Sequence, residues 1–244
     1  MAGHSKWANT KHRKGRADAK KGKIFSRIAK EIISAAKIGG PDPKSNPRLR
    51  LALQKARIAN MPNDNIDRNI SKASNVDQAD FHELTYELYG HGGVGLVIDV
   101  MTDNKNRISS EMRIATNKRG GTIANPGAVT FNFDRKGVIQ ISKKQALEEE
   151  LFLAATDAGA EDFEVEEDSF ILTTDPTDLY AVKEALNQAG FECEEVELEM
   201  IPKSLVECDT EKAKENLALI EWLEDLEDVD AVYHNMKLPD DFEA

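Results

Sequence analysis

The spacing of apolar residues divides the chain into a helical first part and a body in which strands and helices alternate. Between residues 24 and 35, apolar side chains recur at helical spacing, and basic side chains form a second stripe. This pattern predicts an amphipathic helix that starts near Lys23 and ends at Gly39-Gly40-Pro41.

Two further short helices are predicted before residue 75. Asn46 and Pro47 suit the N-cap and the first turn of a helix that runs to about residue 60. Pro62 opens a third helix, with Ile66 and Ile70 on its apolar face. The three helices predict a small bundle, and the last two also allow a helix-turn-helix arrangement.

The body begins with two strand-like runs at residues 82–89 and 94–101. The second run, VGLVIDVM, is almost continuously apolar and β-branched, which predicts a central strand. Between the runs, residues 90–95 match the letters of the dinucleotide fingerprint G-x-G-x-x-G. A strand follows them where the fingerprint requires a helix, so a glycine-rich hairpin turn is favoured over a nucleotide loop.

After the hairpin, Asp103 or Asn104 predicts the cap of a helix that extends to about residue 117. Asp99 and Asp103 could suggest a metal site or an acid–base pair. Helix capping and solvation at a strand end are the simpler explanation, because no third metal ligand stands nearby. Residues 118–121 form a basic, glycine-rich turn, which suits either a phosphate or a helix C-cap. Residues 129–133 are predicted to form a strand.

Residues 137–202 have the order strand–helix–strand–strand–helix–strand, the split βαβ order of ferredoxin-like domains. The predicted strands are 138–142, 161–165, 169–173 and 191–200, and the helices are 145–158 and 177–189, with Leu147, Leu151 and Ala154 inward in the first. The chain then returns to the earlier unit with a strand at 204–207, a helix at 210–226 and a strand at 231–235.

These elements predict an α+β chain with three domains. Residues 1–75 form a basic arm and a three-helix head, and residues 80–135 with 203–240 form a middle α/β domain. Residues 136–202 form a ferredoxin-like domain inserted in the middle one, so that two α/β ferredoxin-like sandwiches result. Arg135-Lys136-Gly137 and Ile201-Pro202 are the predicted hinges of the insert.

Charge is distributed unequally between these parts. Residues 1–72 contain 18 Lys and Arg against 5 Asp and Glu, whereas the whole chain has a net charge of −12. A basic head on an acidic body predicts that the head binds a polyanion, most simply nucleic acid. The acidic runs of the body are interpreted as solvated faces that also repel nucleic acid.

Within the head, residues 1–23 contain too few apolar side chains to fold alone and predict a mobile arm that orders on a phosphate backbone. Trp7, with His4 or His12, is suited to stack on an unpaired base. The alternative is a solvated tail with Trp7 packed on the body. The predicted nucleic-acid-binding residues are Lys6, Trp7, Lys11, His12, Arg13, Lys14, Arg16, Lys20, Lys21, Lys23, Arg27, Lys30, Arg48, Arg50, Lys55 and Arg57.

Five stretches carry a resemblance to a known family: MAGHSKWANTKHRKGRADAKKGKIFSRIAKEI, GGPDPKSNPRLRLALQKARIANMP, TDNKNRISSEMR, KRGGTIANPGAVTFNF and GFECEEVELEMIP. Across essentially its whole length the chain resembles the YebC family, which includes the mitochondrial translational activator of cytochrome c oxidase. One departure is His91, where the family pattern has proline. The resemblance implies a three-domain protein that acts in gene expression, either as a DNA-binding transcriptional regulator or as a ribosome-associated factor that relieves stalling on proline-rich nascent chains.

No catalytic constellation is present: H-E-x-x-H, G-x-S-x-G and Walker motifs are absent, and Cys193 and Cys208 form no C-x-x-C pair. We therefore expect no enzyme activity, no cofactor, no metal and no small-molecule substrate. Without an apolar membrane span or a signal-peptide core, a reduced cytoplasmic location without membrane contact is predicted. Expected partners are the ribosome and nucleic acid (ribosomal RNA, tRNA or DNA), and a ligand-sensing or enzymatic ferredoxin-like domain is the remote alternative.

Overall fold

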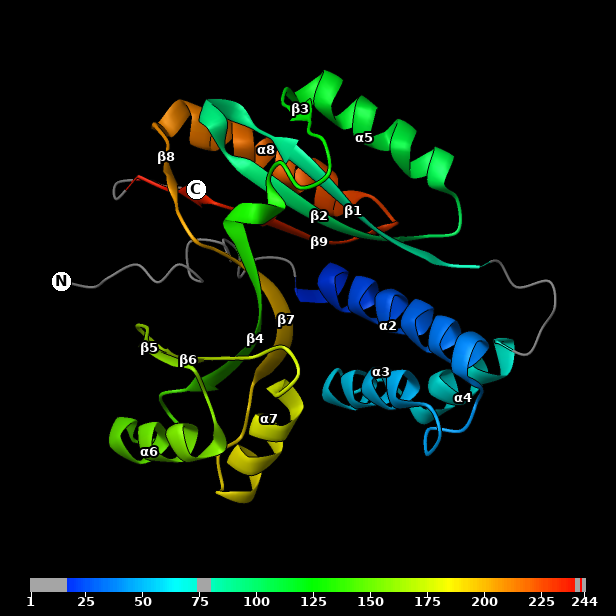
Figure 1. Cartoon of the computed structure of the whole chain (residues 1–244), viewed down its shortest axis with the longest axis vertical. Helices are drawn as coiled ribbons and strands as arrows, with labels where there is room; N and C mark the ends of the chain where they lie inside the picture. Colours follow the sequence, from blue (N-terminus) through cyan, green and yellow to red (C-terminus); the bar gives the residue numbers. More distant parts are fainter. Residues whose placement is uncertain (1–16, 74–79, 240–241, 243–244) are drawn as a thin grey trace.

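The computed structural model describes residues 17–73, 80–239 and 242, with side chains from residue 22 onward. It contains a helical bundle and two four-stranded antiparallel sheets, each part with a hydrophobic core of its own (Figure 1). The predicted α+β class is confirmed. Within the described residues, no helix has the length and apolar composition that a membrane span requires.

The bundle consists of α2 (Ala17–Gly39), α3 (Pro47–Ile58) and α4 (Asn63–Lys72). The Asn46 side chain caps α3 by accepting from the Leu49 amide at 3.0 Å, and its own amide group donates to the carbonyls of Ala35 and Gly40 at 2.8 Å each. One residue therefore closes the end of α2 and starts α3, as the predicted cap requires.

Helix α2 starts earlier than predicted, because residues 17–22 are helical and the predicted arm covered residues 1–23. The sequence ADAKKG is rich in Ala and Lys, which favour helix even without apolar side chains to bury. Residues 1–16 of the predicted arm lie outside the described residues.

The first sheet has the order β3-β1-β2-β9, with β1 (His82–Tyr89) and β2 (Gly95–Thr102) joined by the predicted hairpin. The apolar strand β2 is central, as expected, and lies between β1 and β9 (Val229–His234). Helices α5 (Lys105–Arg119) and α8 (Thr210–Asp225) pack on one face of this sheet around a shared core.

One predicted strand of this unit is wrong, and a second is shorter than predicted and lies in another sheet. In place of a strand at residues 129–133, Thr130–Asn132 forms a 3₁₀ turn, and the edge strand is β3 (Thr122–Ile123). In place of a strand at 204–207 in the same sheet, β8 (Val206–Glu207) pairs in parallel with β10 (Met236–Lys237) in a separate two-stranded sheet. Both segments, 129–133 and 204–207, are short, and their conformation depends on distant residues: the Thr130 amide bonds Glu87, and β8 pairs with β10.

The second sheet has the order β5-β6-β4-β7, and its elements follow the predicted βαββαβ order. A prediction that fails here is an inward Leu147, because α6 begins at Glu148 and Leu147 is 67% exposed. The elements are β4 (Phe133–Ser142), α6 (Glu148–Ala158), β5 (Asp162–Val165), β6 (Ser169–Thr174), α7 (Leu179–Gln188) and β7 (Glu195–Pro202).

A two-stranded ribbon connects the two sheets. Strand β4 pairs with β7 from Phe133↔Pro202 to Gln140↔Glu195, and in Figure 1 these strands run together from one sheet to the other. The residues predicted as hinges, 135–137 and 201–202, therefore lie in paired strands and not in loops. The domain boundaries drawn from the sequence stay a prediction.

Candidate nucleic-acid interface

The predicted interface residues fall into three groups. Lys6, Trp7, Lys11, His12, Arg13, Lys14 and Arg16 lie outside the described residues, and Lys20 and Lys21 lie in α2 with undescribed side chains. Lys23, Arg27, Lys30 and Lys55 contact acidic or carbonyl groups of the protein itself. Arg48, Arg50 and Arg57 are exposed on α3.

The basic stripe of α2 faces the loop between α8 and β9. The Lys23 ammonium donates to the carbonyls of Glu224 and, at 3.1 Å, of Leu226, which lie at the C-terminal end of α8. Carbonyls at a helix C-terminus have no intrahelical donor and carry partial negative charge, so they attract a cation. Burial lowers the pKa of Lys23, against the opposing charges of nearby acids.

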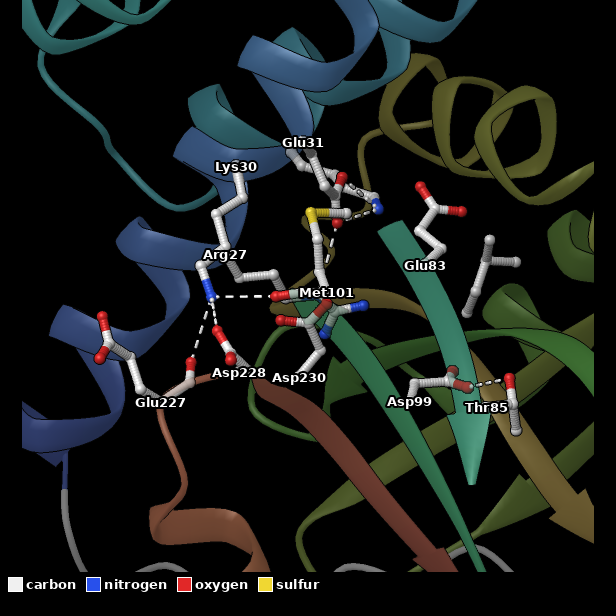
Figure 2. Close-up of polar contacts among 12 residues, drawn as sticks. Arg27, Lys30, Glu31, Glu83, Thr85, Asp99, Met101, Glu227, Asp228 and Asp230 are labelled. Carbon is white, nitrogen blue, oxygen red and sulfur yellow. Dashed lines mark hydrogen bonds and ion pairs between the residues drawn. The ribbon is translucent and has the colours of Figure 1, made fainter. Parts of the chain in front are cut away.

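Two turns further along α2, Lys30 reaches a buried carboxylate. Its ammonium donates to the carbonyl of Met101 at 3.1 Å and to that of Glu227 at 3.2 Å, and it lies 3.3 Å from Asp228 Oδ1. Figure 2 shows these three acceptors around the Lys30 nitrogen, between β2 and the loop before β9. The head is thus bound to the middle sheet by a side chain that sequence reasoning assigned to nucleic acid.

Asp228 is the centre of this junction, because its carboxylate is only 3% exposed and has three donors. The Arg107 guanidinium donates from Nη2 at 2.5 Å and from Nε at 3.1 Å, and the Thr102 hydroxyl donates at 2.8 Å. Burial by itself would raise the pKa of Asp228, but the bonds from Arg107 and Thr102 and the charge of Lys30 outweigh it and lower the pKa. The carboxylate is therefore charged at neutral pH.

A second cluster lies beside the first and joins α2, α3 and β9. Arg27 Nε is 3.3 Å from Glu31 and 4.0 Å from Asp230, and Lys55 of α3 binds both carboxylate oxygens of Glu31 at 2.7 and 3.0 Å. Burial raises the pKa of Asp230 to about 6, because Arg27 and Lys30 only partly offset it. Figure 2 shows Asp230 and Asp228 on the same side of α2.

The exposed cations of the head lie on α3. Arg50 and Arg57 are seven residues apart and so share one face of the helix, about 10 Å apart along its axis. Arg50 Nη1 donates to the Pro43 carbonyl at 3.3 Å, and Arg48 pairs with Glu83. Among the predicted side chains that the structure describes, Arg57 alone makes no polar contact with another described residue. Arg68 and Lys72 of α4 are exposed cations that sequence reasoning missed.

The glycine-rich turn before β2 has a structural role. The His91 amide donates to Asn216 Oδ1 at 2.8 Å, and the His91 ring lies 2.8 Å from the Arg119 carbonyl and 3.1 Å from Glu215. The predicted hairpin is confirmed, with His91 as a turn residue that contacts a backbone carbonyl. The basic turn at residues 118–121 packs against it, and the Arg119 guanidinium lies 5.2 Å from the Trp222 ring centre in a cation–π contact.

Sequence reasoning also missed Glu87 of β1, which is buried. Its carboxylate accepts from the amides of Gly127, Val129 and Thr130 at 2.5, 2.6 and 2.8 Å. Burial raises the pKa of Glu87, but these backbone bonds outweigh it and lower the pKa. The loop between β3 and β4 is therefore shaped by one carboxylate, which from sequence resembles an ordinary polar strand position.

Comparison with known proteins gives consistent matches for both parts of the chain. Residues 5–76 match the TACO1/YebC protein N-terminal domain, and residues 81–236 match the TACO1/YebC second and third domain. The chain belongs to the TACO1/YebC family. The crystal structure of a conserved hypothetical protein of this fold, Aq1575 from Aquifex aeolicus, has a TM-score of 0.85 and 41% identity, over 97% of this chain and 98% of that chain.

Relatives of this TACO1/YebC chain are similar over their whole length. A protein of Protochlamydia amoebophila, named probable transcriptional regulatory protein pc1328, is 79% identical over 243 residues, which span 100% of this chain and 99% of that protein. A probable transcriptional regulatory protein of Chlamydia muridarum is 58% identical over 237 residues, or 97% of this chain and 100% of that protein.

Proposed function

We propose that this TACO1/YebC chain is a non-enzymatic regulator of gene expression that binds nucleic acid through its basic N-terminal head. The names of the chlamydial relatives support a regulator. The observation that carries the binding role is the charge distribution: residues 1–72 hold 18 of the 32 Lys and Arg, whereas the rest of the chain is strongly acidic. Cations gathered on one end supply the electrostatic part of nucleic-acid affinity.

The contacts of the head narrow this proposal. Lys23, Lys30 and Lys55 are engaged with the protein's own carbonyls and carboxylates, so we assign them to holding the head on the body. We assign nucleic-acid contact to the basic residues of positions 1–16 and to Arg50 and Arg57, whose face of α3 is open to solvent. In this arrangement the acidic body excludes nucleic acid from the rest of the surface.

Of the two possible targets, ribosomal RNA and duplex DNA, we propose ribosomal RNA as the first candidate. The chain would then act as a ribosome-associated translation factor that relieves stalling. A basic segment with an aromatic residue, Trp7, suits the unpaired bases of irregular RNA better than a regular duplex. The second candidate is a DNA-binding transcriptional regulator that uses the same cations, and the names of the relatives favour it.

The test compares ribosomes and duplex DNA at one salt concentration. Full-length protein, a variant with Lys11, Arg13, Lys14 and Arg16 changed to Glu, and an Arg50→Ala/Arg57→Ala variant are sedimented with ribosomes and titrated with duplex DNA. Arg50 and Arg57 are exposed on α3, and we expect the thermal midpoints of both variants to match that of the parent protein. Lys105→Ala/Lys214→Ala is the control, since it removes two exposed cations of the body.

We expect ribosome association that both head variants weaken and the control leaves unchanged, with only weak, sequence-independent DNA binding. Tight binding to particular promoter sequences without a ribosomal fraction would favour the transcriptional regulator. Head variants that bind both targets as well as the control would refute the proposed surface.

A further inference from the structure

A groove lies in the head between α2 and α4, on the side of α2 that does not carry the Lys23 and Lys30 contacts. Its volume is about 200 Å³. Helices α2 and α4 lie side by side in the bundle (Figure 1). The groove is lined by Phe25, Ser26, Ala29 and Met61 and, along α4, by Asn65, Arg68, Asn69 and Lys72.

The side chains of α4 are sorted by chemistry. Asn65, Arg68, Asn69 and Lys72 are spaced i, i+3, i+4 and i+7 and therefore form one stripe, which lines the groove. The acids of the helix, Asp64 and Asp67, are exposed and do not line it. The apolar residue Ile66 faces the bundle core. One wall of the groove is thus amide and cationic, and the other is mainly apolar.

Asn69 is the unusual member of this stripe. The residue as a whole is only 8% exposed, but its side-chain amide atoms are not among the fully buried atoms that lack a hydrogen-bond partner. The amide is therefore reached from the groove, where it can bond water or a ligand. Because Asn69 lines the groove, its donor and acceptor are available to a molecule bound there.

We propose that this groove binds one unstacked base of a single-stranded nucleic acid, with Arg68 and Lys72 on the neighbouring phosphates. The inference rests on the proposed function and adds a site to it. An Asn amide offers a donor and an acceptor side by side, which match the paired acceptor and donor groups on the edge of a base. The apolar wall of Ala29 and Met61 suits the flat face of the ring.

Size and position agree with this occupant. Drug-sized ligands occupy pockets of roughly 300–1,000 Å³, so this smaller groove suits a single ring. Its residues on α2 begin eight positions after the start of the helix at Ala17, about 12 Å along the axis. The groove therefore lies near the N-terminal end of the described part of α2. A base in a duplex is stacked and could not enter, so the groove selects unpaired nucleotides.

The experiment uses the full-length protein and two fluorescein-labelled RNA strands of equal length, one with bases and one abasic. Fluorescence anisotropy gives both affinities for the parent protein, for Asn69→Leu and for Arg68→Ala/Lys72→Ala. Asn69→Leu keeps the branching of the side chain but removes both hydrogen-bonding groups, and its thermal midpoint should be unchanged or higher. Lys105→Ala/Lys214→Ala is the matched control for two lost charges.

For Asn69→Leu we expect affinity for the strand with bases to fall about three- to tenfold, with affinity for the abasic strand unchanged. Arg68→Ala/Lys72→Ala should lower the affinity for both strands. It should also reduce the slope of log affinity against log salt by about 1.4, or roughly 0.7 for each lost phosphate contact. The control should change neither quantity.

A parent protein that binds RNA while both groove variants match the control would overturn the site and leave the proposed function intact. The same holds if Asn69→Leu binds RNA more tightly, since the amide would then make no favourable contact with a base. A parent protein that binds neither strand would overturn the proposed function itself.

Discussion

Replacement of Asp228 by Asn tests the junction between the head and the middle sheet. Asn keeps the shape of the side chain and removes the charge that Arg107, Thr102 and Lys30 all contact. Removing one partner of a buried ion pair costs about 3–5 kcal/mol because the other charge is left uncompensated. Arg107 is 42% exposed and keeps its pair with Asp103 at 2.8 Å, so solvent and that pair reduce the loss.

The expected destabilisation from Asp228→Asn is therefore about 2–4 kcal/mol. For a chain of this length it corresponds to a fall in thermal midpoint of roughly 4–16 °C. The lowered pKa of Asp228 fixes the pH dependence: its stabilisation is present above the unfolded pKa of about 4 and is lost as pH falls through the lower folded value. The difference between parent and variant should thus shrink below pH 4.

Circular dichroism melts at pH 7 and pH 3 measure both effects. Asp157→Asn is the control, because Asp157 is an exposed aspartate of α6. A double-mutant cycle with Lys30→Met isolates the part of the destabilisation that comes from the contact between Lys30 of the head and Asp228. This part should appear as a coupling energy of about 1 kcal/mol. An Asp228→Asn midpoint equal to that of the control at pH 7 would refute the reasoning.

Three further predictions concern other buried groups. Asp230→Asn should stabilise the protein above pH 6 and change little near pH 4, because a folded pKa raised to about 6 makes the parent less stable as pH rises through that range; equal pH profiles of the melting midpoint would contradict it. Glu87→Gln should lower the free energy of unfolding by about 2–3 kcal/mol and speed amide hydrogen exchange at residues 127–130. Unchanged exchange would mean that the loop keeps its conformation without the carboxylate. Gly120→Ala should lower the free energy of unfolding, measured by urea denaturation, by about 1–3 kcal/mol. The residue has a φ of +79°, and the added Cβ would lie 2.5 Å from the His91 ring. A second change, His91→Ala, should restore only the part that comes from this clash, and full restoration would exclude backbone strain as a cause.

Local features of the fold could be predicted from the sequence. Asn46-Pro47 fixed the start of α3, and the apolar run of β2 fixed a central strand, because capping groups and strand burial are properties of a few adjacent residues. The βαββαβ order of the second sheet follows from turn residues and periodicity in the same way.

Features that depend on distant partners could not be predicted. The basic stripe of α2 has the composition of a solvent-exposed face, but Lys23 and Lys30 contact carbonyls at positions 224, 226, 227 and 101, and any residue type can supply a carbonyl. Glu87 has the same difficulty, because its donors are backbone amides some 40 positions later. Residues 135–137 were predicted to be a hinge because they lack the alternation of apolar and polar side chains that marks a strand. They are nevertheless paired with β7, in the ribbon between the two sheets.

The ribbon also affects the order in which the chain can fold. Strands β2 and β9 are neighbours in the first sheet but are separated by residues 103–228, so closing this loop directly would be costly in entropy and slow. Once the second sheet has formed, Phe133 and Pro202 are paired, and the route from β2 to β9 no longer includes the 68 residues between them. The second sheet should therefore form before the first one closes, so that this insertion acts as the scaffold for the unit that contains it.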